Sequence, residues 1–134
     1  MGKHTFTKGE RLCSKRLIDN LFRNGSSFFI YPYRVTFSFT AKREYPVEVL
    51  FAVPKRRFRH AVQRNLLKRR MREAYRQQKE ALYQQVGEQS FTLTVAIQYA
   101  THKIPDYSQL FARMAEVLQK LQHESAQVHM GESH

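Results

Sequence analysis

The sequence predicts an α+β domain, a two-layer α/β sandwich in which a small β-sheet packs against helices in the order α-β-β-α-β-α. Three observations support this fold class. Three short segments have the composition and patterning of strands, and longer segments with apolar residues at helical spacing separate and flank them. The 134 residues, of which 42% are hydrophobic and 13% aromatic, are enough to bury one core without disulfides.

The first helix is expected over residues 12–22, where Leu17, Ile18, Leu21 and Phe22 recur at helical spacing and Gly25 supplies the C-terminal cap. Apolar and polar side chains then alternate over residues 33–40, as they do in a half-buried strand. Tyr33, Val35, Phe37 and Phe39 form its core face, and a second strand covers residues 47–53. The turn signal at residues 42–46 predicts a hairpin between these two strands.

A long helix is expected from Ala61 to about Gln85, because this segment has no Gly or Pro and is rich in helix-forming residues. A third strand follows over residues 91–97. Pro105 and Asp106 open the last helix, with Asp106 and Gln109 at capping-box spacing. Its apolar stripe consists of Leu110, Phe111, Met114, Val117, Leu118 and Leu121. We therefore expect one domain over residues 1–123 and a disordered tail over residues 124–134.

The positive charge is concentrated in one part of the chain. The formal net charge is +12 and the isoelectric point is about 10.2, which points to a polyanionic partner. Twenty of the 23 basic residues precede residue 80. Residues 55–76 contain ten basic side chains and a single acidic one, Glu73. Such a segment needs a compensating partner or wide exposure to solvent.

The long helix separates its basic residues from its apolar ones. Arg64, Lys68, Arg72 and Arg76 recur every four residues, about 6 Å apart along the axis, and Asn65 and Arg69 lie beside them. The adjoining arc consists of Leu67, Met71, Ala74 and Tyr75. Because that arc is needed to cover the sheet, it is unavailable to a membrane surface or to a calmodulin-type partner. The row of arginines favours nucleic acid, since guanidinium groups bind phosphate bidentately.

Catalytic and metal-binding patterns are scarce. The carboxylates are scattered, the six histidines show no ligand spacing, and no Gly-rich phosphate loop is present. We interpret Glu73 as a partner in an intrahelical ion pair, His60 as a polar neighbour of the helix cap, and Cys13 as structural. The sequence predicts a protein that binds RNA or DNA without cutting it by its own side chains.

Neither a signal core nor a run of 18 apolar residues occurs, and one cysteine permits no intrachain disulfide. We therefore expect a cytoplasmic protein with neither a membrane nor a disulfide-linked partner.

Residues 53–73 contain Arg64-Asn65-x-x-Lys68-Arg69-x-x-Arg72-Glu73, preceded by a strand that ends in the basic pair Lys55-Arg56. This pattern resembles the signature of the bacterial ribonuclease P protein subunit. The similarity extends to the opening helix after Phe6 and to the last strand and helix, about 115 residues in all. Leu66, Ile18 and Thr36 depart from the family, which often has a basic residue at the first position and an aromatic one at the other two.

The resemblance implies a mixed sheet with a left-handed βαβ crossover. It also implies an endoribonuclease in which a large RNA is the catalyst and Mg²⁺ is held mainly by RNA phosphates. The partners would be that catalytic RNA and precursor tRNA, from which the enzyme removes the 5′ leader. This chain would have no active site of its own. It would bind the catalytic RNA through eight residues, Lys55, Arg56, Arg59, Arg64, Asn65, Lys68, Arg69 and Arg72.

The same resemblance places the 5′ leader in a cleft lined by Ile18, Phe22, Arg34 and Thr36. Plain core packing is the competing interpretation of Ile18 and Phe22. The alternative function is a non-catalytic basic RNA- or DNA-binding module, such as a ribosomal protein.

Overall fold

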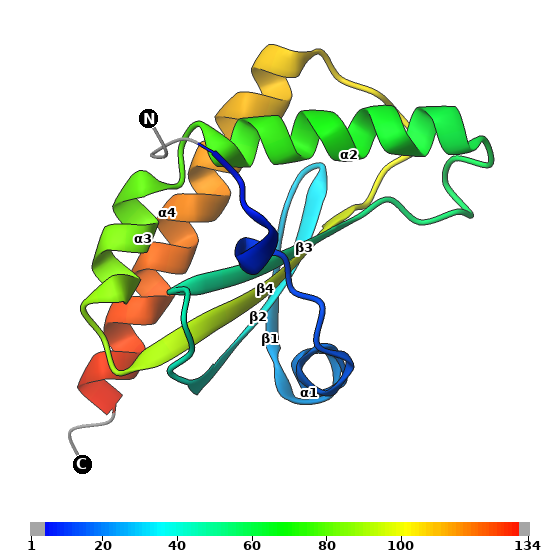
Figure 1. Ribbon diagram of the computed structural model, residues 1–134. Coiled ribbons are helices and arrows are strands. Elements are labelled where there is room, and N and C mark those ends of the chain that lie inside the picture. Colours follow the sequence, from blue (N-terminus) through cyan, green and yellow to red (C-terminus); the bar gives the residue numbers. More distant parts are fainter. Residues whose placement is uncertain (1–4, 132–134) are drawn as a thin grey trace.

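A computed structural model of the chain describes residues 5–131, and its centre is a four-stranded sheet in the order β1-β2-β4-β3 (Figure 1). The strands are β1 (Ser26–Ile30), β2 (Tyr33–Ala41), β3 (Val47–Ala52) and β4 (Phe91–Tyr99). β2 pairs antiparallel with β1 and with β4, whereas β3 pairs parallel with β4. The expected α+β class with a mixed sheet is confirmed.

The predicted hairpin between β2 and β3 is wrong, because β4 lies between these two strands. β4 is buried along nearly its whole length, which is typical of a strand in a sheet that is covered on both faces. The predicted turn still meets β4, since Thr92 Oγ1 donates to the Tyr45 carbonyl at 3.0 Å and Leu93 N to the Pro46 carbonyl at 2.9 Å.

β1 is a strand for which the sequence analysis made no prediction. It forms the hairpin with β2, and the pairing puts Phe28 opposite Val35 and Phe29 opposite Arg34. Directly opposed residues share one face of a sheet. Phe28 and Ile30 therefore pack against the core, while Ser27 and Phe29 lie on the other face with Arg34 and Thr36.

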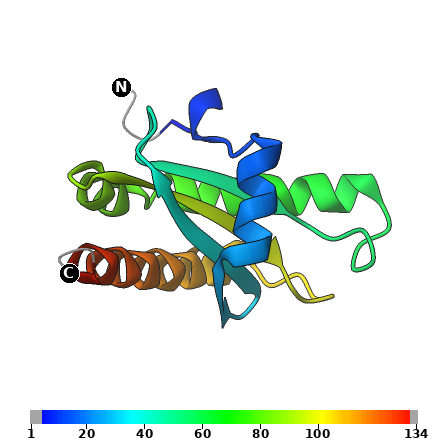
Figure 2. The same ribbon diagram turned by 90° about the horizontal axis from the view of Figure 1, so that it is seen from below.

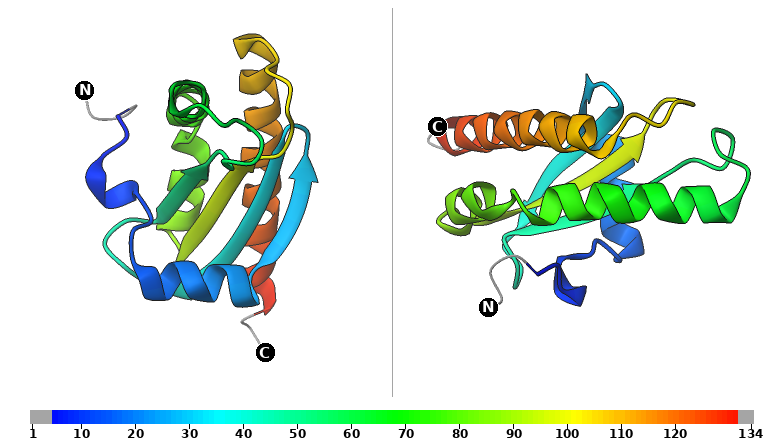
Figure 3. Two further views of the ribbon diagram at one scale, coloured as in Figure 1. Left: turned by 90° about the vertical axis from the view of Figure 1, so that its right-hand side faces the viewer. Right: turned by 90° about the horizontal axis from the view of Figure 1, so that it is seen from above.

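The helices are η1 (Lys8–Glu10, a 3-10 turn), α1 (Lys15–Asn24), α2 (Ala61–Arg76), α3 (Glu80–Gly87) and α4 (Tyr107–Gly131). α2, α3 and α4 cover one face of the sheet, and α1 crosses the other (Figures 1 and 2). In the left view of Figure 3, β4 lies to the right of β3, both strands run upward, and α3 lies behind the sheet. The crossover from β3 to β4 is therefore left-handed, an exception to the usual rule.

The long helix expected over residues 61–85 is two helices, and the chain turns at residues 77–79. No Gly or Pro marks this break. Side chains hold it: Gln78 Nε2 donates to the carbonyls of Ala74 and Phe111, both at 3.0 Å, and Lys79 is drawn into a buried ion pair with Glu10. The turn lets Leu82 and Val86 of α3 enter the core, where both are buried.

The apolar positions expected in the core are found there. Leu67, Met71, Ala74 and Tyr75 of α2 are fully buried, as are Tyr33 and Val35 of β2, and Phe37 is nearly so. Phe39 is partly buried against the same cluster. On α4, Leu110, Met114, Val117, Leu118 and Leu121 are buried and Phe111 is partly buried, so the predicted stripe is confirmed.

Both ends of the domain differ from the expected boundaries. α1 begins at Lys15 with Ser14 as its N-cap, and Leu12 instead donates its N–H to the Val49 carbonyl at the edge of β3, at 3.0 Å. α4 begins after Asp106, whose carboxylate accepts from Gln109 N at 3.1 Å. It continues to Gly131 with Ser125 fully buried. The tail expected to be disordered from residue 124 is therefore helical up to Gly131, and residues 132–134 lie outside the described part.

Candidate nucleic-acid interface

The basic row on α2 lies beside the helix's buried stripe, as the spacing predicted. Asn65 and Arg69 are exposed, while Arg64, Lys68 and Arg72 are half-buried. Lys55, Arg56 and Arg59, on the loop that leads from β3 into α2, are exposed as well. The eight residues assigned to the catalytic RNA thus come from one helix and the loop before it, and each is exposed or half-buried.

Arg64 has a structural contact that its spacing did not predict. Its Nη1 donates to the carbonyl of Phe58 at 2.9 Å and to that of Arg59 at 2.7 Å. Phe58 is buried against Tyr99, with ring centroids 5.8 Å apart. One side of the Arg64 guanidinium therefore holds the loop that carries Lys55, Arg56 and Arg59, and only its remaining donors can reach a phosphate.

Glu73 pairs within its own helix, as predicted. Arg76 Nε donates to its carboxylate at 3.1 Å, and Gln77 Nε2 donates at 2.6 Å. The hydrogen bonds from Arg76 and then from Gln77 lower the pKa of Glu73. Arg76 is thereby ion-paired, whereas no ion pair is found for Arg64, Lys68 or Arg72 within the described part of the chain.

Among the described side chains, which end at residue 128, no three of the types His, Cys, Asp and Glu come close enough to hold a metal ion. His60 is the N-cap of α2, although its side chain makes no capping hydrogen bond. Cys13 is free and exposed. Nor does any helix in the described part have the length and apolarity needed to span a bilayer.

The residues assigned to the leader lie on the sheet face that α1 crosses, or on α1 itself. Arg34 is exposed on this face. Thr36 is only 6% exposed, and its hydroxyl lies 3.1 Å from that of Ser27. Ile18 is half-buried against Leu12, Leu17, Leu21 and Ala96, whereas Phe22 is 48% exposed. The competing interpretation, core packing, therefore accounts for most of the Ile18 side chain but for little of the Phe22 side chain.

Phe29 is an aromatic on this face that the sequence analysis did not consider. Its ring is 51% exposed, and the Arg34 guanidinium carbon lies 5.9 Å from the ring centroid. The register places Phe29, Arg34, Gln98 and Ala52 in one row across all four strands. The signal that could have identified it is the short run of β-forming apolar residues at 28–30, bounded by Gly25 and Pro32.

Comparisons with known proteins agree on one family. The family profile described as Ribonuclease P matches residues 6–122. A protein named Ribonuclease P protein component from Porphyromonas gingivalis (strain ATCC 33277) is 36% identical over 102 residues, which are 75% of this chain and 74% of that protein. One of the same name from Chlorobium phaeobacteroides is 43% identical over 84 residues, 60% of this chain and 58% of the relative.

A solved structure shows the same fold. The RNase P protein from Thermotoga maritima superposes with a TM-score of 0.64 at 20% identity, covering 83% of this chain and 96% of that one.

Proposed function

Because this chain belongs to the ribonuclease P protein family, and so is the RNA-binding subunit of the enzyme that processes the 5′ ends of tRNA, we propose how it divides its surface. The α2 face binds the catalytic RNA, and the sheet face crossed by α1 binds the leader of precursor tRNA. The observation that carries the proposal is the concentration of cations on α2 and its preceding loop, where they are exposed or half-buried beside the buried stripe of the helix.

We place the catalytic centre in the RNA and not in this chain. Hydrolysis of a phosphodiester by protein side chains needs clustered carboxylates for metal ions, or a paired acid and base. Among the described residues, no three His, Cys, Asp or Glu side chains gather as a metal site would require. By the same argument Mg²⁺ would be held mainly by RNA phosphates, and the cations on α2 would support it by drawing those phosphates together.

Seven residues are proposed as direct contacts to the catalytic RNA: Lys55, Arg56, Arg59, Asn65, Lys68, Arg69 and Arg72. Arg64 has a double role, since it holds the loop through the Phe58 and Arg59 carbonyls and presents its remaining donors. Arginines at helical spacing can bind the phosphates of RNA without contacting its bases. Such contacts are suited to a catalytic RNA, whose folded shape is fixed.

The leader is proposed to lie on the sheet face, against Phe22, Ile18, Arg34 and the small exposed part of Thr36. Leaders differ in sequence, so flat apolar surface and charge suit them better than hydrogen bonds to base edges. Phe29 supplies the exposed ring on this face that neither Ile18 nor Thr36 provides.

Reconstitution tests the proposed function. The chain alone should leave precursor tRNA intact, and at low Mg²⁺ it should stimulate cleavage by the cognate catalytic RNA. A well-folded protein that gives no stimulation would contradict the proposal. The alternative, a non-catalytic basic RNA- or DNA-binding module such as a ribosomal protein, predicts comparable affinity for generic duplex and no effect on cleavage.

A further inference from the structure

A small pocket lies where the N-terminal segment, the edge of β3 and α2 meet. Its volume is about 160 Å³, and Arg11, Lys68 and Arg72 line it together with the apolar side chains of Phe6, Leu50 and Phe51. A cavity of about 150 Å³ is enough for a benzene-sized ring. The pocket therefore combines three cations with apolar side chains in a space that one flat group could occupy.

The positive charge of this pocket is uncompensated. Arg72 Nε is buried and has no hydrogen-bond partner, and no carboxylate of residues 5–131 forms an ion pair with Arg11, Lys68 or Arg72. Burial, and then the charge of Arg11, lower the pKa of Arg72. A buried donor between like charges is costly unless an anion accepts from it.

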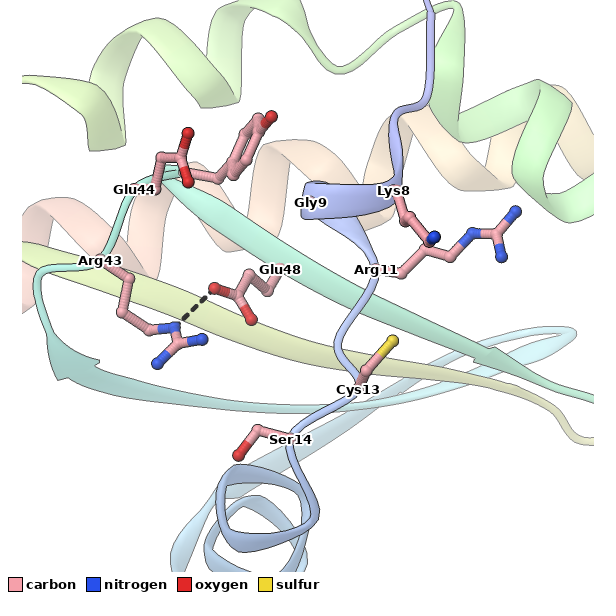
Figure 4. Close-up of a pocket in the computed structure, with 9 residues that line it drawn as sticks. Lys8, Gly9, Arg11, Cys13, Ser14, Arg43, Glu44 and Glu48 are labelled. Carbon is pink, nitrogen blue, oxygen red and sulfur yellow. Dashed lines mark hydrogen bonds and ion pairs between the residues drawn. The ribbon is translucent and has the colours of Figure 1, made fainter.

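The segment that carries Arg11 is held in place. Lys79 binds the carboxylate of Glu10 and the carbonyl of Thr5, and Leu12 pairs with Val49 on β3. Figure 4 shows the side chains of Lys8, Arg11 and Cys13 projecting to the same side of this segment, away from the Arg43–Glu48 ion pair. The backbone that carries Arg11 is thus positioned before any ligand binds, which reduces the entropy lost on binding.

We propose that this pocket binds one nucleotide of the catalytic RNA, with a phosphate between Arg11 and Arg72 and the base or ribose against Phe6 and Phe51. The inference rests on the proposed function and adds Arg11 to the interface. Catalytic RNA is the occupant because Lys68 and Arg72 belong to the same row on α2 as Arg64, so RNA bound along that row reaches the pocket.

Cys13 gives a direct test, because it lines the pocket, is exposed, and is the sole cysteine of the sequence. Its alkylation by iodoacetamide should slow in proportion to the fraction of protein bound to the catalytic RNA. In a Cys13→Ser/Ser90→Cys control, the thiol lies in the exposed turn before β4 and should react at an unchanged rate. Protection by precursor tRNA but not by the catalytic RNA would overturn the assignment.

A matched pair of variants tests the charge. Arg11→Gln should weaken binding to the catalytic RNA about tenfold, the loss of one charged hydrogen-bonded contact, and leave thermal stability unchanged because Arg11 is exposed. Arg113→Gln removes the same charge from α4 and should leave affinity unchanged. If the wild-type protein stimulates cleavage while Cys13 stays fully reactive and Arg11→Gln binds normally, the pocket is refuted and the proposed function stands.

Discussion

Arg64 and Arg69 look equivalent in the motif but have different surroundings. Arg64 is tied to two loop carbonyls, whereas Arg69 is exposed and no ion pair involves it within the described range. A side chain that only contacts phosphate contributes about one unit to the salt slope of RNA affinity. Replacing Arg64 should therefore also loosen the loop whose carbonyls it binds.

Arg69→Ala should therefore weaken binding to the catalytic RNA and reduce the slope of log affinity against log salt by about one, without changing the melting temperature. Arg64→Ala should reduce the slope by at least as much and also increase proteolysis of the loop over residues 54–60. Salt titrations and limited proteolysis of both variants check this. An unchanged slope for Arg69→Ala would remove it from the phosphate contacts.

Phe29 is expected to act through its ring, not through its bulk. Stacking of a base on an aromatic side chain contributes about 1–3 kcal/mol, so Phe29→Leu should weaken holoenzyme binding of precursor tRNA with a long leader by about tenfold. Phe29→Tyr keeps the ring and should behave as the wild type. Equal affinity of Phe29→Leu and wild type for the long-leader substrate would exclude stacking at this position.

The Glu10–Lys79 pair is the most deeply buried charge pair in the described structure, with 3% and 4% of the two residues exposed. Tyr83 also donates to Glu10 at 2.8 Å, and Thr7 N at 2.7 Å. Lys79→Met would leave the carboxylate buried without its cation, which should cost about 3–5 kcal/mol of unfolding free energy. The double variant Glu10→Gln/Lys79→Met should recover much of that loss in chemical denaturation. A double variant no more stable than Lys79→Met would contradict this explanation.

The same pair predicts a pH dependence. Burial on its own would raise the pKa of Glu10, but hydrogen bonds from Lys79, Thr7 and Tyr83 outweigh it and lower the pKa below the ordinary 4.5. A carboxyl whose pKa is lower in the folded state contributes stability above about pH 4.5, and this contribution is lost as the pH falls through the folded-state value. Unfolding free energy measured from pH 6 downward should therefore decline less for Glu10→Gln than for wild type.

At the scale of elements, the sequence predicts what depends on local pattern. The apolar stripes of α2 and α4 and the core face of β2 follow from periodicity alone, and the structure buries them as expected. Gly25 was expected as the cap of α1, and it is, though for a different reason. Its φ is −77°, and a Cβ there would lie 2.4 Å from the Leu21 carbonyl oxygen. Close approach of the backbone, not a left-handed conformation, requires glycine.

What the sequence did not predict depends on long-range pairing. The adjacency of β2 and β4 joins residues about sixty positions apart, and no turn signal encodes it. The break between α2 and α3 depends on Glu10, far away in the chain. The surface assigned to the catalytic RNA was predicted because it lies on one helix and its loop, whereas Phe29 and Arg11 become visible only when strand pairing places them beside Arg34 and Arg72.

Across the whole molecule, the net charge of +12 is unevenly distributed along the chain. Residues before 80 hold 20 basic and 5 acidic side chains, more than the whole excess, and include the N-terminal segment, the basic loop and α2, while the slightly acidic remainder supplies α3, β4 and α4. α1 and the open sheet face lie on the opposite side of the sheet from α3 and α4 (Figure 2). The two surfaces proposed for RNA therefore differ in position: the basic row lies on α2, which covers the same sheet face as α3 and α4, and the leader face is the one that α1 crosses (Figures 1 and 2).

The proposal that the protein contributes a leader-binding face to an RNA enzyme can be tested directly. The measurement is the affinity of the catalytic RNA, with and without this chain, for precursor tRNA with a long leader and for mature tRNA. We expect the chain to strengthen binding of the precursor and to leave binding of mature tRNA nearly unchanged. Equal strengthening of both would contradict it, because the effect of the chain would then be independent of the leader.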